Sequence, residues 1–318
     1  MSNKEKYREI CESGEYYVPL FLQHWWMEAV CAGKQWDVAL ACDGSAVKGA
    51  MPFHYVDRFG LRFVVQPQLT QFSGPVYFYP QGISESHRLD FEKQVADSLL
   101  RQIDDRHPHF FLQNFSPDVT NWLPFYWAGY RQTTRYTYRI GDIRDPQRVF
   151  DGFDAEKRQR KIRRYENATS VRFDMSPRDF ADFHTRYWNE KGKRDVLDKR
   201  LIERVCSAAV ERGQGVVAAL YDDNGSLLSA RFAVYDSRCA YSLMSAHDNA
   251  LHKNGHSETL FWDLIKFLSD KTVAFDFEGS MDEGIEFFYR SFGARQTPFF
   301  EICKSRNALI DFLIKRHK

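Results

Sequence analysis

The sequence predicts a mixed α+β protein that contains two copies of one folding unit in tandem. The repeat appears in residues 125–133, FYWAGYRQT, and 288–297, FYRSFGARQT, which share Phe-Tyr and a Gly-x-Arg-Gln-Thr string. In both copies a Phe-rich strand precedes the string and an aromatic-rich strand follows it. Self-similarity with matching elements on both sides is typical of a duplicated unit. We place the boundary in the turn-rich segment 141–147, which gives units at 1–143 and 144–318.

Hydrophobic patterns and turn signals predict the elements of the first unit. Apolar positions at helical spacing predict a helix over 19–32. Two apolar runs around Asp43-Gly44 predict a β-hairpin. Further strands are expected in LRFVVQP and GPVYFYP, followed by a polar helix over 84–105 and a buried strand at 109–115.

The second unit follows the same order of elements. A basic amphipathic helix is expected over 146–168, and Ser176-Pro177 is typical of a helix start. Asn224-Gly225 between two apolar runs is the strongest hairpin signal in the chain. From residue 240 to 303 we expect a strand, a loop, and then alternating helices and strands.

Composition excludes several classes of protein. With 43% hydrophobic and 27% charged residues, disorder, collagen and coiled coil do not describe the chain. Lys plus Arg (44) nearly balances Asp plus Glu (43), which disfavours a DNA-binding protein. The six cysteines form no CxxC pair, and no window approaches the roughly 20 apolar residues of a membrane span. We therefore expect a cytoplasmic protein without a transmembrane segment.

The loop after the strand at 240–246 carries a family resemblance. A bound pyrophosphate needs backbone N–H groups at a helix N-terminus with no bulky side chain in front of them. SLMSAHDNALHKNGHSETLFWDLI resembles the pyrophosphate loop of the GCN5-related N-acetyltransferase (GNAT) superfamily, although only the central glycine of that pattern is kept. The resemblance implies that the acyl donor is held by His252, Lys253, Asn254, Gly255, His256 and Ser257.

The segment FDFEGSMDEGIEFFYRSFGA, with the tandem repeat and the basic run RQRKIRRYENA, resembles the FemAB-like branch of this superfamily. That branch includes enzymes that add amino acids to peptidoglycan precursors. The resemblance covers about residues 20–305 and implies two GNAT-like units, each a mainly antiparallel sheet flanked by helices. The chain has no room for the long helical arm of some cell-wall enzymes, which disfavours an aminoacyl-tRNA donor.

Candidate catalytic residues lie in the same segment. Alternate residues of a strand share a face, so we expect Asp276 and Glu278 to point the same way. Acyl transfer to an amine needs a base, and Glu278 is the first candidate for base or ammonium anchor. The alternative is that one carboxylate pairs with a nearby arginine and the other faces solvent. The resemblance makes Tyr289 a candidate acid toward a departing thiolate, while Tyr126 at the equivalent place of the first unit favours a shared packing role.

Two further segments are candidates for binding. The run KRQRKIRR over 157–164 is either a solvated helix face or an anion site, and the resemblance places Arg160, Lys161 and Arg164 beside the acceptor. Gln68 and Gln71, in the polar insert QPQLTQFSGP, could hydrogen-bond a ligand or merely decorate a loop.

These features predict an N-acyltransferase that uses an acyl-CoA co-substrate and an amine acceptor bound between the two units. The acceptor is a small molecule or a cell-wall precursor. We expect no tightly bound cofactor, and the ten histidines show no metal-ligand spacing. Two alternatives stay open: a Fem-like aminoacyl-tRNA-dependent transferase acting on a cell-wall precursor, and a non-catalytic protein that keeps the fold.

Overall fold

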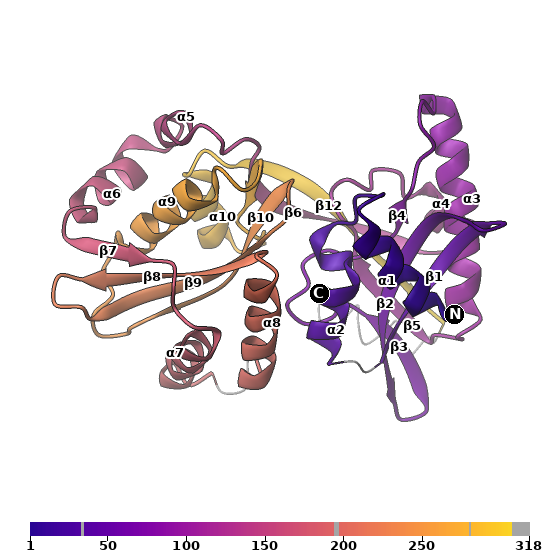
Figure 1. Ribbon diagram of the computed structural model, residues 1–318, viewed down its shortest axis with the longest axis horizontal. Coiled ribbons are helices and arrows are strands. Elements are labelled where there is room, and N and C mark those ends of the chain that lie inside the picture. Colours follow the sequence, from indigo (N-terminus) through magenta and orange to yellow (C-terminus); the bar gives the residue numbers. More distant parts are fainter. Residues whose placement is uncertain (33–34, 194–196, 280, 307–318) are drawn as a thin grey trace. The chain divides into compact units, whose positions relative to one another are not determined.

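A computed structural model of the chain describes residues 1–32, 35–193, 197–279 and 281–306. The chain forms two compact units (Figure 1). Unit 1 contains Met1–Arg135 and Pro298–Lys318, and unit 2 contains Tyr136–Thr297. Both combine helices with mostly antiparallel strands, which confirms the predicted fold class. Among the described residues, no helix is both long and apolar enough to span a membrane.

In unit 1 the strands run in the order β1-β2-β3-β5-β12, with β4 beside β2. Helix α3 packs on one face of β1 and β2, and α1 and α2 pack on the other, because alternate residues of these strands face opposite sides. The elements of unit 1 are α1 (Asn3–Ser13), α2 (His24–Cys31), β1 (Trp36–Asp43), β2 (Ala46–Arg58), β3 (Leu61–Val65), β4 (Val76–Tyr77), α3 (Glu85–Asp104), β5 (Phe110–Asn114), α4 (Leu123–Trp127) and most of β12 (Arg295–Ser305).

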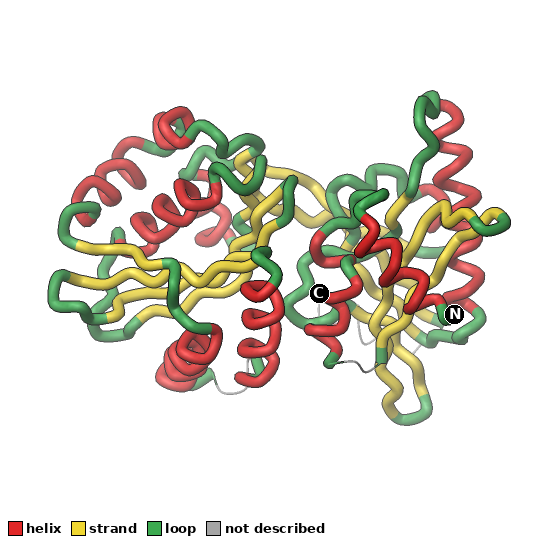
Figure 2. The backbone as a smooth tube through the Cα atoms, in the orientation of Figure 1, coloured by secondary structure: helices red, strands yellow, loops and turns green. Residues whose placement is uncertain are grey.

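In unit 2 the strand order is β6-β11-β10-β9-β8-β7. Helices α5, α6, α9 and α10 lie over one face of the strands and α7 and α8 over the other (Figures 1 and 2). Its elements are the second half of β6 (Arg131–Ile140), α5 (Pro146–Asp151), the π-helical turn Ala155–Gln159, α6 (Arg160–Tyr165), β7 (Thr169–Arg172), α7 (Pro177–Glu190), α8 (Lys199–Glu211), β8 (Gly215–Asp222), β9 (Leu227–Tyr235), β10 (Cys239–His247), α9 (His256–Leu268), β11 (Ala274–Asp276) and α10 (Glu283–Arg290).

The two units share one succession of elements. A strand leads through a helix to a parallel neighbour, then to a short helix and a final strand. In the first copy these are β3, α3, β5, α4 and β6, and in the second they are β10, α9, β11, α10 and β12. The final strands are exchanged, however. Strand β6 pairs with β11 in unit 2, and β12 pairs with β5 in unit 1. Each unit is therefore completed by the last strand of the other copy.

This exchange makes the division of the chain differ from the boundary at 143/144. Residues 136–140 belong to unit 2 because the end of β6 pairs with β11, where Ile140 lies opposite Phe275. The described residues 298–306 belong to unit 1, where Ile302 of β12 is fully buried. Because each unit contains a strand from the other copy, no single position in the sequence separates the two units.

Two predicted elements also differ from the structure. The helix expected over 146–168 is broken at Gly152, and Asp154 then caps a π-helical turn by accepting a hydrogen bond from the N–H of Lys157. The N-terminal helix α1 was not predicted, although Ser2 and Glu5 form a capping box at its start.

We expect the exchanged strand to be required for unit 1 to fold. A fragment of residues 1–135 lacks β12 and leaves the core around Ile302 open, so it should show no cooperative thermal transition by circular dichroism. The same fragment joined to residues 298–306 by a short Gly-Ser linker should melt cooperatively. The fusion carrying Ile302→Asp is the control and should behave like the shorter fragment. Cooperative melting of residues 1–135 alone would contradict the assignment.

Candidate functional site

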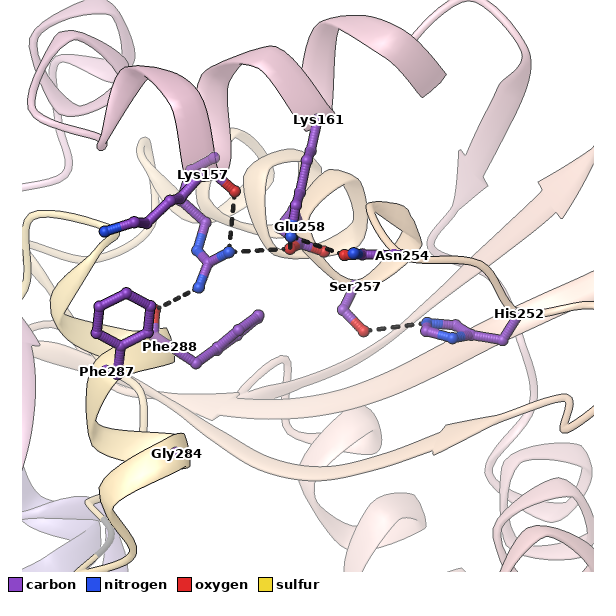
Figure 3. A pocket seen from close by; sticks show the side chains of 10 residues that line it. Lys157, Lys161, His252, Asn254, Ser257, Glu258, Gly284, Phe287 and Phe288 are labelled. Carbon is purple, nitrogen blue, oxygen red and sulfur yellow. Dashed lines mark hydrogen bonds and ion pairs between the residues drawn. The ribbon is translucent and has the colours of Figure 1, made fainter.

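A pocket of about 440 Å³ opens in unit 2 at the start of α9. Its walls come from the basic segment before β7, the loop before α9, the first turn of α9, and α10 (Figure 3). The lining residues are Lys157, Arg158, Lys161, His252, Asn254, Ser257, Glu258, Gly284, Phe287 and Phe288. The pocket thus joins two features that the sequence presents separately, the loop at 252–257 and the basic run.

The start of α9 leaves backbone donors available to a ligand. Gly255 is the N-cap, with φ 116°, and no side chain caps the helix. A Cβ at this position would lie 2.5 Å from the ring of Tyr165, so both backbone angle and space require glycine. The first N–H groups of a helix have no partner within the helix and attract anions. The local structure therefore suits a phosphate.

Buried charges lie against this helix start. Glu258 accepts hydrogen bonds from Arg158 Nη1 at 3.0 Å and from Lys161 Nζ at 2.9 Å, and Lys161 also donates to Asn254 Oδ1 at 2.7 Å (Figure 3). The side chains of Arg158 and Glu258 are each 4% exposed. Burial lowers the pKa of Arg158, and the Glu258 carboxylate opposes that shift. Two cations share one carboxylate, which leaves a positive balance facing the pocket.

The predicted donor residues divide into two groups. His252, Asn254 and Ser257 line the pocket, and His252 Nε2 lies 3.2 Å from Ser257 Oγ. The other residues do not line it. Gly255 lies under Tyr165, and Lys253 is exposed. His256 is buried, and its Nδ1 accepts a hydrogen bond from the backbone N–H of Lys253.

The basic run divides in the same way. Lys161 lines the pocket, whereas Arg160 is exposed and pairs with Glu156, and the Arg164 guanidinium lies 5.6 Å from the centre of its neighbour's ring, Tyr165. Lys157 lies over the Phe287 ring at 4.4 Å. The π-helical turn directs Arg158 inward, which regular helical spacing does not predict.

Three histidines lie in a row from the end of β10 to α9. The rings of His247 and His252 are 4.2 Å apart, and those of His252 and His256 are 5.5 Å apart. Burial lowers the pKa of all three, to about 3 for His247 and about 4 for His256. The row is therefore neutral near pH 7. Within the described part of the chain, no group of three or more His, Cys, Asp or Glu residues is arranged to hold a metal ion.

The second candidate cluster lies where β10 and β11 separate. These strands pair only between Cys239 and Tyr241 on β10, and β10 then has an irregular register at Ser242 to Met244. Strand β11 ends at Asp276, and Glu278 has φ 58°, so the alternation used to predict a shared face does not extend to Glu278. A non-glycine residue at positive φ is uncommon and often marks a functional site.

Asp276 holds this strand end in place. It is fully buried and accepts hydrogen bonds from Thr137 Oγ1 at 2.5 Å, Arg139 Nε at 2.6 Å and the backbone N–H of Glu278 at 2.8 Å. Gly279 follows, and a Cβ there would collide with the Tyr136 carbonyl oxygen. The structure therefore gives Asp276 an arginine partner and a positioning contact to Glu278.

Glu278 is half-buried and interacts electrostatically with the buried Arg231, and the structure gives no hydrogen bond between these two side chains. Burial raises the pKa of Glu278 well above its usual value, the Asp276 carboxylate adds to this, and Arg231 opposes it. Glu278 Oε1 and Arg231 Nε are both buried and unpartnered. Arg231 Nη1 donates to Ser242 Oγ at 2.6 Å, and burial lowers the pKa of this guanidinium to about 10. Polar atoms of this kind are candidates for contact with a ligand or water.

Tyr289 lies next to this pair and differs from its counterpart in the first copy. Its ring centre lies 5.1 Å from that of Phe277 in the unit 2 core. Burial raises the pKa of Tyr289, and Arg231 opposes the shift. Tyr126 is 58% exposed and its ring lies 5.5 Å from that of Trp122, so the two tyrosines are buried to different extents and their shared packing role stays a prediction.

Gln68 and Gln71 lie in the folded insert of unit 1. The insert is held by Gln66, whose side chain donates to the Thr70 carbonyl and accepts from the N–H of Asn114. Gln68 is exposed and Gln71 is half-buried. Their ligand contacts stay predictions.

We expect the Arg158–Glu258 pair to be strongly coupled. Glu258→Ala leaves a buried guanidinium without its carboxylate and should lower the free energy of unfolding by about 3–5 kcal/mol in urea denaturation. A double variant, Arg158→Met with Glu258→Leu, removes both charges and should recover most of that loss. Glu156→Ala, which removes the partner of exposed Arg160, should leave stability unchanged. Additive losses in the double variant would show that the two charges do not interact.

Comparisons with known proteins agree with this arrangement. A sequence model of the acetyltransferase (GNAT) domain matches residues 155–286. The fold is similar to the crystal structure of FemX, with TM-score 0.69 and 12% identity over 94% of this chain and 96% of that one. It is also similar to L-PGS from Bacillus licheniformis, with TM-score 0.61 and 14% identity over 98% and 94% of the two chains.

A tandem GNAT protein from the clavulanic acid biosynthesis pathway is similar with TM-score 0.52 and 12% identity, over 94% of this chain and 92% of that one. No curated protein matches the sequence. Residues 155–286 thus match the GNAT domain, and the fold of the whole chain is similar to the folds of FemX and of the tandem GNAT protein.

Proposed function

We propose that the protein is an N-acyltransferase that takes its acyl group from an acyl-CoA. The observation that carries the proposal is the pocket at the start of α9, which is lined by Lys157 and Lys161 and by the first turn of a helix that no side chain caps. A pyrophosphate supplies the negative charge and the acceptor oxygens that such a site lacks. The GNAT domain match covers the residues that line this pocket up to Gly284.

In the proposed reaction the acceptor is a primary amine. Its nitrogen attacks the thioester carbonyl, the C–S bond breaks, and the proton lost by nitrogen passes to the Glu278 carboxylate. The departing thiolate takes a proton from the Tyr289 hydroxyl. A carboxylate whose pKa is raised by burial is a better base near neutral pH than an exposed one. Asp276 acts by positioning Glu278 through its backbone N–H.

The acceptor is proposed as a small amine or an amine of a cell-wall precursor. FemX has a similar fold. The FemAB-like branch that the sequence resembles includes enzymes that add amino acids to peptidoglycan precursors. Gln68 and Gln71 in unit 1 and Arg160 and Arg164 in unit 2 stay predicted acceptor contacts. The expected position of the acceptor between the two units is likewise a prediction.

Two other functions are alternatives to be separated by experiment. An aminoacyl-tRNA donor would place phosphates of the RNA at the same basic pocket, and its binding would weaken steeply with salt. A non-catalytic protein would keep the fold without turnover. The loop departs from the family pattern at His252 and Ser257, which is the feature that favours this second alternative.

We expect CoA and acetyl-CoA to stabilise the protein in a thermal-shift titration. At about 100 times its dissociation constant a ligand adds about 2.7 kcal/mol of stability. Lys161→Met should weaken binding about tenfold or more, because it removes a charge-assisted hydrogen bond. Arg160→Met, which removes a cation outside the pocket, is the matched control. If no acyl-CoA of any length gives a saturable shift while tRNA binds with steep salt dependence, the donor assignment is wrong.

We expect Glu278→Gln to abolish most of the turnover without weakening donor binding. General-base catalysis contributes about 10²- to 10⁴-fold, so thiol release from acetyl-CoA with a panel of amines should fall by at least that lower factor. The wild-type rate should decline as pH falls through the raised pKa of Glu278, and the variant should lack this limb. Glu283→Gln, an exposed neighbour on α10, is the control. Unchanged turnover in Glu278→Gln would remove this residue from the mechanism.

A further inference from the structure

The hairpin of β2 and β3 in unit 1 ends in an exposed aromatic residue. Arg58 pairs with Leu61, so Phe59 and Gly60 form a two-residue turn, with φ 54° and 73°. The Phe59 side chain is 100% exposed. In Figure 1 the hairpin extends beyond the helices of unit 1, and Figure 2 shows its turn at the tip.

Phenylalanine is a poor residue for the fold at this position. Positive φ at both central residues defines a type I′ turn, which strongly prefers Asn or Gly first and Gly second. A bulky side chain at positive φ is an outlier, and a fully exposed ring gains nothing from burial. Stability alone would favour Asn-Gly in place of Phe59-Gly60. The aromatic ring at the tip therefore calls for a role outside the fold of unit 1.

One face of the hairpin continues this apolar tip. Val56, Arg58, Phe59, Phe63 and Val65 line a shallow hollow of about 400 Å³. The strand register explains why these side chains lie together. Val56 lies opposite Phe63, and Arg58, two residues after Val56, lies opposite Leu61 on the same face of the hairpin.

Arg58 and Arg62, the two arginines near the tip, differ in whether a carboxylate pairs with them. Arg62, on the other face, pairs with Asp57 at 2.8 Å. For exposed Arg58 the structure gives no ion pair within the described residues. The tip thus combines an apolar stripe, an exposed ring and an uncompensated cation.

We propose that this hairpin tip inserts into the surface of a bilayer that contains anionic phospholipids. Aromatic side chains partition into the membrane interface, and an arginine beside them pairs with lipid phosphates. A protein partner fits less well, because five side chains at the end of one hairpin fall far short of the roughly 20–30 residues that each side of a stable interface contributes. The hairpin would act as one weak contact that brings unit 1 to the membrane.

The test is a flotation assay of the full-length protein with vesicles. One set contains phosphatidylcholine alone, and the other contains phosphatidylcholine with about one third phosphatidylglycerol. The wild type should float with the anionic vesicles and much less with the neutral ones. Arg58→Gln should reduce the partition coefficient about fivefold, which corresponds to about 1 kcal/mol per basic residue at an anionic surface.

Phe59→Asn is the decisive variant because it improves the turn while it removes the ring. It should reduce vesicle binding at least tenfold and leave the melting temperature unchanged or higher. Leu89→Asn, which changes another exposed apolar residue of unit 1, should bind vesicles like the wild type. The proposal fails if the wild type does not float, or if Phe59→Asn floats equally well. Concentration-dependent self-association that Phe59→Asn abolishes, without vesicle binding, would assign the tip to a protein contact and also overturn the proposal.

Discussion

Asp276 is the residue on which the candidate chemistry of unit 2 most depends. Its buried carboxylate compensates Arg139, accepts from Thr137, and accepts from the N–H of Glu278. Thr137 and Arg139 lie on β6, the last strand of the first copy, whereas Glu278 follows β11 of the second. The strand exchange therefore does more than complete a sheet. It brings side chains of one copy to the carboxylate of the other, and that carboxylate also holds the backbone N–H of Glu278, whose φ is 58°.

Much of the fold could be predicted from local sequence signals, but the exchange of the final strands β6 and β12 between the two units could not. Asn224-Gly225, the Ser176 cap and the repeated strings around 125–133 and 288–297 each act within a few residues. The final strands, however, have similar aromatic patterns in both copies, so each could pair with either penultimate strand. Partner choice depends on buried contacts between distant residues, such as those of Ile302. The break in the helix expected over 146–168 has a local cause. Gly152 and Asp154 mark it in the sequence, but the amphipathic pattern that runs through both sides of the break favoured one long helix.

The candidate site shows the same division between local and distant causes. The loop around Gly255 follows from a local requirement, a helix start without a side chain in front of it. Arg158, Glu258 and Arg231 could not be selected from the sequence, because each becomes distinctive only when burial places an opposite charge or an aromatic ring beside it. A run of basic residues is normally a solvated face, and the π-helical turn is what sends Arg158 inward while Arg160 stays outside.

The two copies have kept the fold and diverged at the helix start. In unit 1, Ser84 caps α3 by accepting a hydrogen bond from the N–H of His87, which occupies one of the donors that a ligand would use. Later in α3, Glu92 is satisfied by Tyr79, Arg88 and Asn121. In unit 2 the corresponding helix α9 begins at an uncapped glycine opposite cations. A binding role inferred for α9 therefore does not apply to α3, because equivalent backbone positions in the two copies present different hydrogen-bond donors and charges.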